Sequence, residues 1–194
     1  IETIRFENGK PCRLELHKRR LASTYLNFYG RQPKWDLSEV LANHKVPAHG
    51  VQKCRITYDE LPTSIDLEPY TISSIRSLKL VEGSQVDYQY KYADREPLNR
   101  LFQKRDGADD ILIIGEGGIT DTSYGNIALM TDDGRWFTPS SYLLNGTMRQ
   151  WLLGTGQIFE RFIDVKDLRL YQSFRVINAL RGWDTTPAKV SDID

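Results

Sequence analysis

The most informative part of this chain reads Ile119-Thr120-Asp121-Thr122-Ser123-Tyr124-Gly125-Asn126, followed by Thr138-Pro139 and then by Leu144-Asn145-Gly146-Thr147-Met148-Arg149. In the first segment, small and polar residues surround an acid at the point where a strand should turn into a loop. In the last segment, Gly146 and Thr147 should open a helix, and the first N–H groups of a helix suit a phosphate. The first loop therefore offers a carboxylate, and the second offers a cradle for a phosphate.

Composition narrows the class of protein. The 194 residues suit one compact unit or two small lobes, and the 26 basic and 26 acidic residues give a formal net charge of zero. Such a balance does not indicate capture of nucleic acid or of an anionic membrane surface. The two cysteines, Cys12 and Cys54, give neither a disulfide framework nor metal-ligand spacing. With no membrane-length apolar run and no signal-peptide pattern, we expect a cytoplasmic protein without a metal site.

Apolar periodicity predicts a mixture of helices and strands, so the expected fold class is α+β. Alternation, turn residues and one continuous apolar run predict strands at 1–6, 13–16, 52–58, 64–69, 75–80, 111–114, 125–130, 135–137, 159–164 and 173–178. Helical spacing and capping residues predict helices at 17–28, from Asp36 to about 43–45, at 95–104, at 147–153 and at 165–170.

The polar segment Val81-Glu82-Gly83-Ser84-Gln85 is the best candidate for a linker. It divides the chain into a small lobe at 1–84 and a larger lobe at 85–194. A cleft between two lobes is a favoured place for a small-molecule site, so we expect the functional site there.

The residues around the acid resemble the signature of the class IV aminotransferase family, the fold-type IV pyridoxal-phosphate enzymes. The family pattern has a glycine, a β-branched residue, a hydroxyl residue and an acid, then Ser and Asn two and five places later. Gly118 to Asn126 match it, except that Asp121 stands where the family usually has Glu. The resemblance implies a two-lobed fold like that of D-amino acid aminotransferase, with pyridoxal 5'-phosphate held in the larger lobe and Asp121 at the ring nitrogen.

Lys91 is the candidate for the lysine that holds the cofactor covalently. Lys91 and Arg95 resemble the Lys-x-x-x-Arg arrangement of the lyase branch of the family. Arg95, one helical turn later, is the cation expected to depress the lysine pKa. Lys79 and Lys104 are the alternatives.

Three segments are candidates for the phosphate. The backbone amides of Thr147 and Met148 open a helix, and in the family the amides at these places bind the phosphate. Residues 14–21 resemble the family element Leu-x-x-His-x-x-Arg-Leu, whose arginine is here Arg20. Asn178 begins Asn-Ala-Leu, which resembles the lyase branch, and it would donate to the phosphate.

The resemblance implies an enzyme that acts on a small-molecule amino substrate and forms a homodimer. The two lyase-like motifs favour a 4-amino-4-deoxychorismate lyase, which releases pyruvate and 4-aminobenzoate. The alternatives are an aminotransferase for branched-chain or D-amino acids and a non-catalytic protein of this fold. Arg5, Arg55 and Arg95 are candidates for binding a substrate carboxylate. The family's usual segment before Glu-Thr-x-Arg is not found in this sequence, and we expect a shortened first lobe to alter substrate binding.

Overall fold

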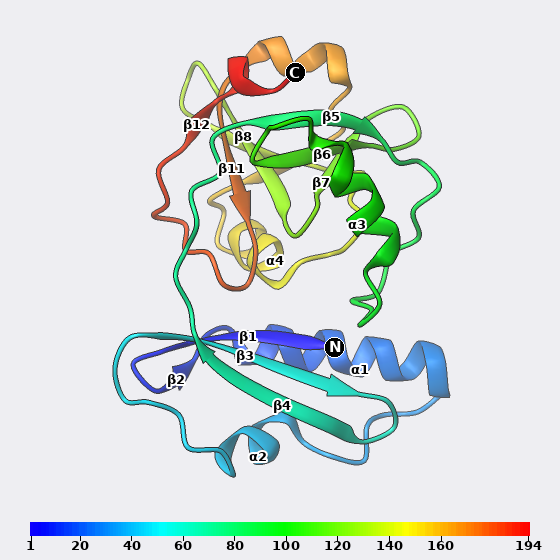
Figure 1. Ribbon diagram of the computed structural model, residues 1–194, viewed down its shortest axis with the longest axis vertical. Helices are drawn as coiled ribbons and strands as arrows, with labels where there is room; N and C mark the ends of the chain where they lie inside the picture. Colours follow the sequence, from blue (N-terminus) through cyan, green and yellow to red (C-terminus); the bar gives the residue numbers. More distant parts are fainter. The chain divides into compact units, whose positions relative to one another are not determined.

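The computed structural model describes residues 1–194 and contains two units, Ile1–Ile72 and Ser73–Asp194 (Figure 1). Each unit has a sheet and helices of its own, which confirms the α+β class. The boundary differs from the one predicted near residue 84. Val81 and Glu82 lie inside a strand of the second unit, and Gly83 is buried, so the segment 81–85 is not a linker.

The N-terminal unit is built on an antiparallel sheet in the order β2-β1-β3-β4. Its strands are β1 (Glu2–Glu7), β2 (Lys10–Pro11), β3 (Val51–Tyr58) and β4 (Pro62–Pro69). Glu2, Ile4 and Phe6 alternate toward the buried face, as the period of a strand requires. The opposite face carries Arg5, whose cross-strand partner is Lys53.

Two helices complete the N-terminal unit, α1 (Leu14–Tyr29) and α2 (Leu37–Ala42). Helix α1 buries His17, Leu21 and Tyr25, and its first turn replaces the strand predicted at 13–16. That prediction is wrong because Arg13 adopts a left-handed conformation, with φ of 53°, and turns the chain into the helix. The predicted cap of α2 is confirmed, since Asp36 Oδ1 accepts from the amides of Ser38 and Glu39 at 2.7 and 3.2 Å.

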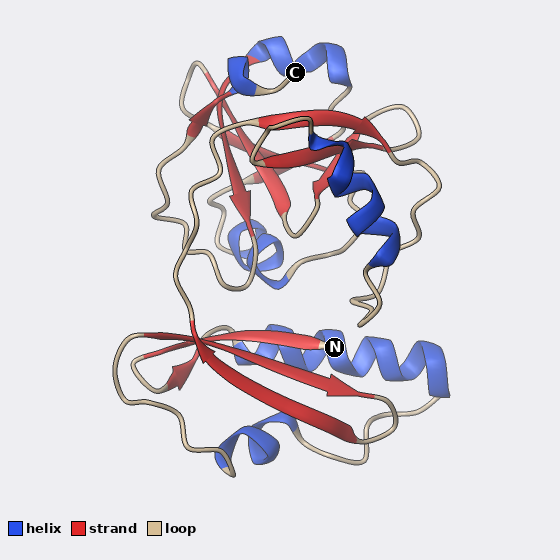
Figure 2. Ribbon diagram, in the orientation of Figure 1, coloured by secondary structure: helices blue, strands red, loops and turns tan.

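The C-terminal unit is built on a larger curled sheet (Figure 2). Its strands are β5 (Leu78–Glu82), β6 (Asp110–Ile114), β7 (Ile119–Thr122), β8 (Asn126–Thr131), β9 (Trp136–Pro139), β10 (Phe159–Arg161), β11 (Tyr171–Ile177) and β12 (Ala188–Lys189). The order runs β10-β9-β8-β7-β6-β5, and β11 pairs with both β8 and β12. Strand β8 therefore has three partners, and the ends of β7, β8 and β11 meet around Asn126, which pairs with Asp121 and Ile177.

The helical segments of the C-terminal unit are mostly short. They are α3 (Glu96–Phe102), α4 (Thr147–Gly154) and the 3-10 turns η1 (Gln103–Arg105), η2 (Val165–Leu170) and η3 (Val190–Asp192). The helix predicted at 165–170 is a 3-10 turn, which Asp164 and Asp167 close with a capping box. No helix of either unit is long and apolar enough to cross a membrane.

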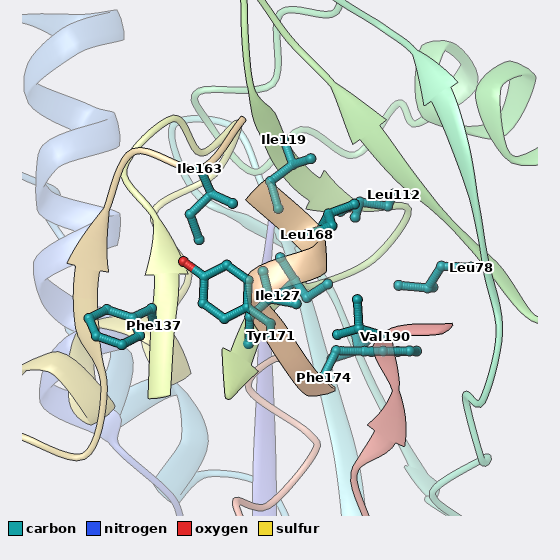
Figure 3. Packing of buried hydrophobic residues seen from close by; sticks show 12 residues of the cluster. Leu78, Leu112, Ile119, Ile127, Phe137, Ile163, Leu168, Tyr171, Phe174 and Val190 are labelled. Carbon is teal, nitrogen blue, oxygen red and sulfur yellow. The ribbon is translucent and has the colours of Figure 1, made fainter. Parts of the chain in front are cut away.

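The largest apolar cluster of the C-terminal unit lies between the curled sheet and the turns η2 and η3 (Figure 3). Leu78, Leu112, Ile119 and Ile127 are fully buried in it, and Phe174 is nearly so. Each such side chain contributes about 1.5–3 kcal/mol relative to an exposed one. The predicted strand at 111–114 is confirmed, and the complete burial of Ile111–Ile113 explains its continuous apolar run.

Candidate active site

Asp121 lies in β7 with only 5% of its surface exposed. Its Oδ1 accepts from Asn126 Nδ2 at 2.8 Å, and its Oδ2 accepts from the amides of Leu143 and Leu144 at 3.2 and 2.9 Å. A carboxylate has about four acceptor positions, so one position on Oδ1 remains after these three bonds.

The charge of Asp121 is held in a buried environment. Burial raises the pKa of its carboxyl to about 6, although the N–H donors of Leu144, Asn126 and Leu143 and the charge of Arg149 lower it in part. A cation bonded to the remaining position on Oδ1 would lower this pKa again. The protonated nitrogen of a pyridine ring is such a cation.

Asn126 joins the acid to the loop that precedes α4. Its Nδ2 donates to Asp121 and also to the carbonyl of Leu144, both at 2.8 Å. A side chain at Gly146 would collide with Asn126 Oδ1, so the N-cap of α4 lies directly against this amide. One buried side chain therefore fixes the acid and the start of the helix together.

Helix α4 begins as the sequence predicts, at Thr147. Its N-cap is Gly146, with φ of −65° and ψ of 145°, and a glycine has no side chain to accept from the first N–H groups. Thr147 and Met148 are buried at this positive end of the helix dipole. The end is therefore built from backbone donors, which suit an anion.

Asn178 follows β11, directly after the residue that pairs with Asn126. Its Oδ1 accepts from the amides of Leu180 and Arg181 at 2.9 and 3.0 Å. Its Nδ2 lies 3.4 Å from the carbonyl of Tyr124, which is a long contact. The donor side of this amide is thus turned toward the loop that follows Asp121.

Arg95 reaches the same loop from the start of α3. Its Nη2 donates to the carbonyl of Ser123 at 2.6 Å, and its guanidinium lies 5.0 Å from the centre of the Tyr124 ring. Its Nε is buried and has no hydrogen-bond partner.

Lys91 stands at the apex of a tight turn, since the amide of Tyr92 donates to the carbonyl of Tyr90 at 3.0 Å. Tyr88 Oη bonds to the carbonyl of Tyr92 at 3.1 Å and fixes the turn further. Tyr92 packs against the same apolar cluster as Leu143 and Leu144, whose amides hold Asp121. The lysine loop and the acid loop therefore share one packing cluster in the C-terminal unit.

The other predicted residues belong to the N-terminal unit. Arg20 donates to Glu2 through Nε at 2.9 Å and Nη2 at 2.6 Å, and Glu2 also accepts from His17 Nδ1 at 2.6 Å. Arg5 pairs with Glu7 at 3.3 Å, and Arg55 lies on β3 opposite Thr3. A phosphate role for Arg20 and a carboxylate role for Arg5 and Arg55 stay predictions.

Sequence reasoning missed the residues that hold the site together. Leu143 and Leu144 contribute only backbone amides, which leave no signal in a sequence. Asp110 is fully buried at the start of β6 and bonds to the amide of Ser123 at 3.3 Å. Its signal was an acid directly before the apolar run at 111–114. No group of three or more His, Cys, Asp or Glu side chains could hold a metal ion.

The donors and acceptors of the C-terminal unit fit pyridoxal 5'-phosphate. Asp121 keeps one acceptor position for a ring N–H. Helix α4 has an N-terminus without a side-chain cap, which suits a phosphate. Lys91 supplies an amine on a loop of the same unit.

Comparison with known proteins identifies the family of this chain. The family Amino-transferase class IV matches residues 1–185. An uncharacterised protein of Haemophilus influenzae strain Rd is 33% identical over 184 residues, which cover 94% of this chain and 97% of that one.

Two solved structures have a similar fold. A Haemophilus somnus 129PT protein, provisionally named a 4-amino-4-deoxychorismate lyase, is 34% identical with a TM-score of 0.87, over 93% of this chain and 95% of that one. The PLP-bound form of a Mycobacterium tuberculosis protein described as a hypothetical aminotransferase shares the fold, with 18% identity and a TM-score of 0.74 over 100% and 80% of the two chains. The chain therefore belongs to the class IV aminotransferase family, and as a member of that family it is a pyridoxal-phosphate-dependent enzyme.

Proposed function

We propose that this enzyme is a lyase of the 4-amino-4-deoxychorismate type, which releases pyruvate and 4-aminobenzoate. One observation carries the proposal. Arg95 and Asn178, the residues that distinguish the lyase-like motifs, both contact the loop after Asp121, Arg95 at the carbonyl of Ser123 and Asn178 at that of Tyr124. The provisional name of the Haemophilus somnus protein, at 34% identity, supports the same reaction.

The proposed roles follow from the chemistry of each group. When bound, pyridoxal phosphate accepts the electrons released as a bond to the amine-bearing carbon breaks. Lys91 would hold the cofactor through Nζ and then move a proton to or from the substrate carbon. Asp121 would keep a proton on the ring nitrogen, and the amides of Thr147 and Met148 with Asn178 would bind the phosphate.

Arg95 has two roles in this proposal. Its cation, four residues after Lys91, would favour the neutral amine of the lysine. Its buried Nε has no partner in the protein, so it could also donate to a substrate carboxylate.

Absorbance tests the cofactor site. Purified protein given pyridoxal phosphate should turn yellow, and the band of the lysine-bound cofactor should be lost in Lys91→Ala. Lys79→Ala is the matched control. Lys79 lies on β5 and pairs with Asp194 at 3.2 Å, so this variant should keep the band. A band that survives Lys91→Ala and disappears with Lys79→Ala or Lys104→Ala would assign the lysine differently.

A substrate comparison tests the reaction. A lyase should release equimolar pyruvate and 4-aminobenzoate from 4-amino-4-deoxychorismate without any added 2-oxo acid. An aminotransferase for branched-chain or D-amino acids should instead need a 2-oxo acid and yield a new amino acid. A protein that binds no cofactor and performs neither reaction would support the non-catalytic alternative.

A further inference from the structure

Three buried polar atoms without a hydrogen-bond partner lie on residues joined through Ser123. They are Asp110 Oδ2, Ser123 Oγ and Arg95 Nε. The amide of Ser123 donates to Asp110 Oδ1 at 3.3 Å, and its carbonyl accepts from Arg95 at 2.6 Å. Buried polar atoms are usually bonded, because an unsatisfied one costs about 1–3 kcal/mol. The hydroxyl of Ser123 and the carboxyl of Asp110 can satisfy one another, which adds a second link between the turn and β6.

Asp110 is the anchor of this group. It is fully buried at the first position of β6, and its Oδ1 also accepts from the amide of Ile111 at 2.8 Å. Burial raises the pKa of its carboxyl, and the nearby hydroxyls of Ser123 and Thr122 lower it in part. A rotation of the Ser123 hydroxyl, or one bound water, would satisfy both unpaired oxygens.

The turn at 122–125 is held at several points. Thr122 Oγ1 accepts from the amide of Gly125 at 3.2 Å, and the amide of Thr122 donates to the carbonyl of Gly125 at 2.8 Å. A side chain at Gly125 would lie 2.8 Å from the carbonyl oxygen of Ile177, so the turn sits tightly against the end of β11. The bond from Ser123 to Asp110 ties the turn to β6.

We infer that Asp110 is a positioning residue, which holds the 122–125 turn so that Ser123 and Tyr124 present their carbonyls to Arg95 and Asn178. Asp110 acts through the turn and does not itself touch the cofactor. The inference rests on the proposed function for the roles of Arg95 and Asn178. That Asp110 holds the turn does not depend on the proposed function.

Two substitutions separate positioning from general stability. Asp110→Ala removes the acceptor for the Ser123 amide, whereas Asp110→Asn keeps an oxygen that can accept it. Val190→Ala is the control for destabilisation, because it removes core volume in η3 and alters no polar group of the turn. Asp132→Asn is the control for charge on an exposed loop.

Hydrogen exchange of the full chain without cofactor gives the first readout. In Asp110→Ala, the amides of residues 123–125 should exchange at least about tenfold faster, as local opening requires. Asp110→Asn should restore most of the protection, and both controls should leave it unchanged relative to the rest of the unit. Equal protection in Asp110→Ala and wild type overturns the inference. If Asp110→Ala does not fold, Ser123→Pro replaces it, because it removes the amide that donates to Asp110. Unchanged protection of residues 124 and 125 in Ser123→Pro then overturns the inference.

The affinity for pyridoxal phosphate gives the second readout. We expect a dissociation constant about tenfold weaker in Asp110→Ala and near wild type in Asp110→Asn. A loosened turn with unchanged affinity overturns the positioning role. Failure of the wild type to bind the cofactor would refute the proposed function, and hydrogen exchange would still decide whether Asp110 holds the turn.

Discussion

Glu2, at the start of β1, forms a hydrogen-bonded group with Arg20 and His17. Its side chain is fully buried and accepts two bonds from Arg20 and one from His17. Burial alone would raise its pKa, but Arg20 and His17 outweigh burial and lower it to about 2. Burial lowers the pKa of His17, so this histidine is neutral and donates through Nδ1–H.

Replacing Glu2 by Gln should therefore destabilise the N-terminal unit. The substitution keeps the size of the side chain but leaves the guanidinium of Arg20 without its counter-charge, which typically costs about 3 kcal/mol or more. Urea unfolding at pH 7 measures the loss. Glu15→Gln, on the exposed first turn of α1, should change stability by less than about 0.5 kcal/mol. Equal effects of the two substitutions would mean that the buried pair contributes nothing.

At the level of helices and strands, the start of α4 depends on a close approach that only glycine allows. Gly146 has an ordinary φ of −65°, so its backbone conformation does not require glycine. A Cβ at this position would instead collide with Asn126 Oδ1, which is fixed by its bonds to Asp121 and Leu144.

Gly146→Ala should consequently lower both thermal stability and affinity for pyridoxal phosphate, by about 1–3 kcal/mol of stability for an overpacked site. Gly154→Ala is the matched control at the other end of the same helix, where a Cβ meets nothing within 4 Å. It should be neutral or stabilising, because alanine favours a helix. Scanning calorimetry and a cofactor titration measure the two effects, and a harmless Gly146→Ala would contradict the close approach.

Local patterns predicted most of the elements, because a strand alternates and a capped helix begins with its own signal. The β8–β9 hairpin, the cap at Asp36 and the start of α4 at Thr147 are confirmed. The segment at 81–85 was misread as a linker because its polar composition hides a packed glycine. A Cβ on Gly83 would lie 2.6 Å from Ile113 and 2.7 Å from Leu101, and such contacts between distant residues are not visible in a sequence.

The same limit applies to the candidate site. Asp121 and Asn126 could be recognised because Gly118 to Asn126 resemble the family signature. The amides of Leu143 and Leu144 could not, since any residue supplies an amide. The partner of Arg20 was also missed, because Glu2 lies eighteen residues earlier in the chain and only the fold brings the two together.

For the whole molecule, acid should affect the two units in opposite directions. Glu2 has a folded pKa of about 2 against an ordinary 4.5. Its contribution to the free energy of unfolding of the N-terminal unit is therefore complete above pH 4.5 and is lost as the pH falls toward 2. Asp121 has a folded pKa of about 6 against 3.8, so the C-terminal unit loses stability as the pH rises from 3.8 to 6 and regains it on acidification. Each shift corresponds to about 3 kcal/mol.

Four other carboxyls have a lowered pKa, but they do not change this contrast between the two units. Asp36 and Glu68 lie in the N-terminal unit and Asp133 and Asp164 in the C-terminal unit, all four largely in solvent, where ion pairs contribute little. Lowering the pH from 5 to 3 should therefore weaken the N-terminal unit more than the C-terminal one. His17 of the N-terminal unit acts in the same direction, because burial lowers its folded pKa below the ordinary 6.5. The unfolded chain then binds the proton first, so this unit begins to lose stability as the pH falls below 6.5.

The tryptophans allow this prediction to be measured. Trp35 is the one tryptophan of the N-terminal unit, where it donates to Tyr25 Oη at 2.8 Å, and Trp136, Trp151 and Trp183 report on the C-terminal unit. Urea unfolding followed by fluorescence in wild type and in Trp35→Phe at pH 5 and pH 3 separates the two signals. The Trp35 transition should move to lower urea at pH 3, and Glu2→Gln should flatten that shift because the titrating group is gone. If both transitions move equally, or if the C-terminal signal is lost first, the buried acids do not control the acid response of this protein.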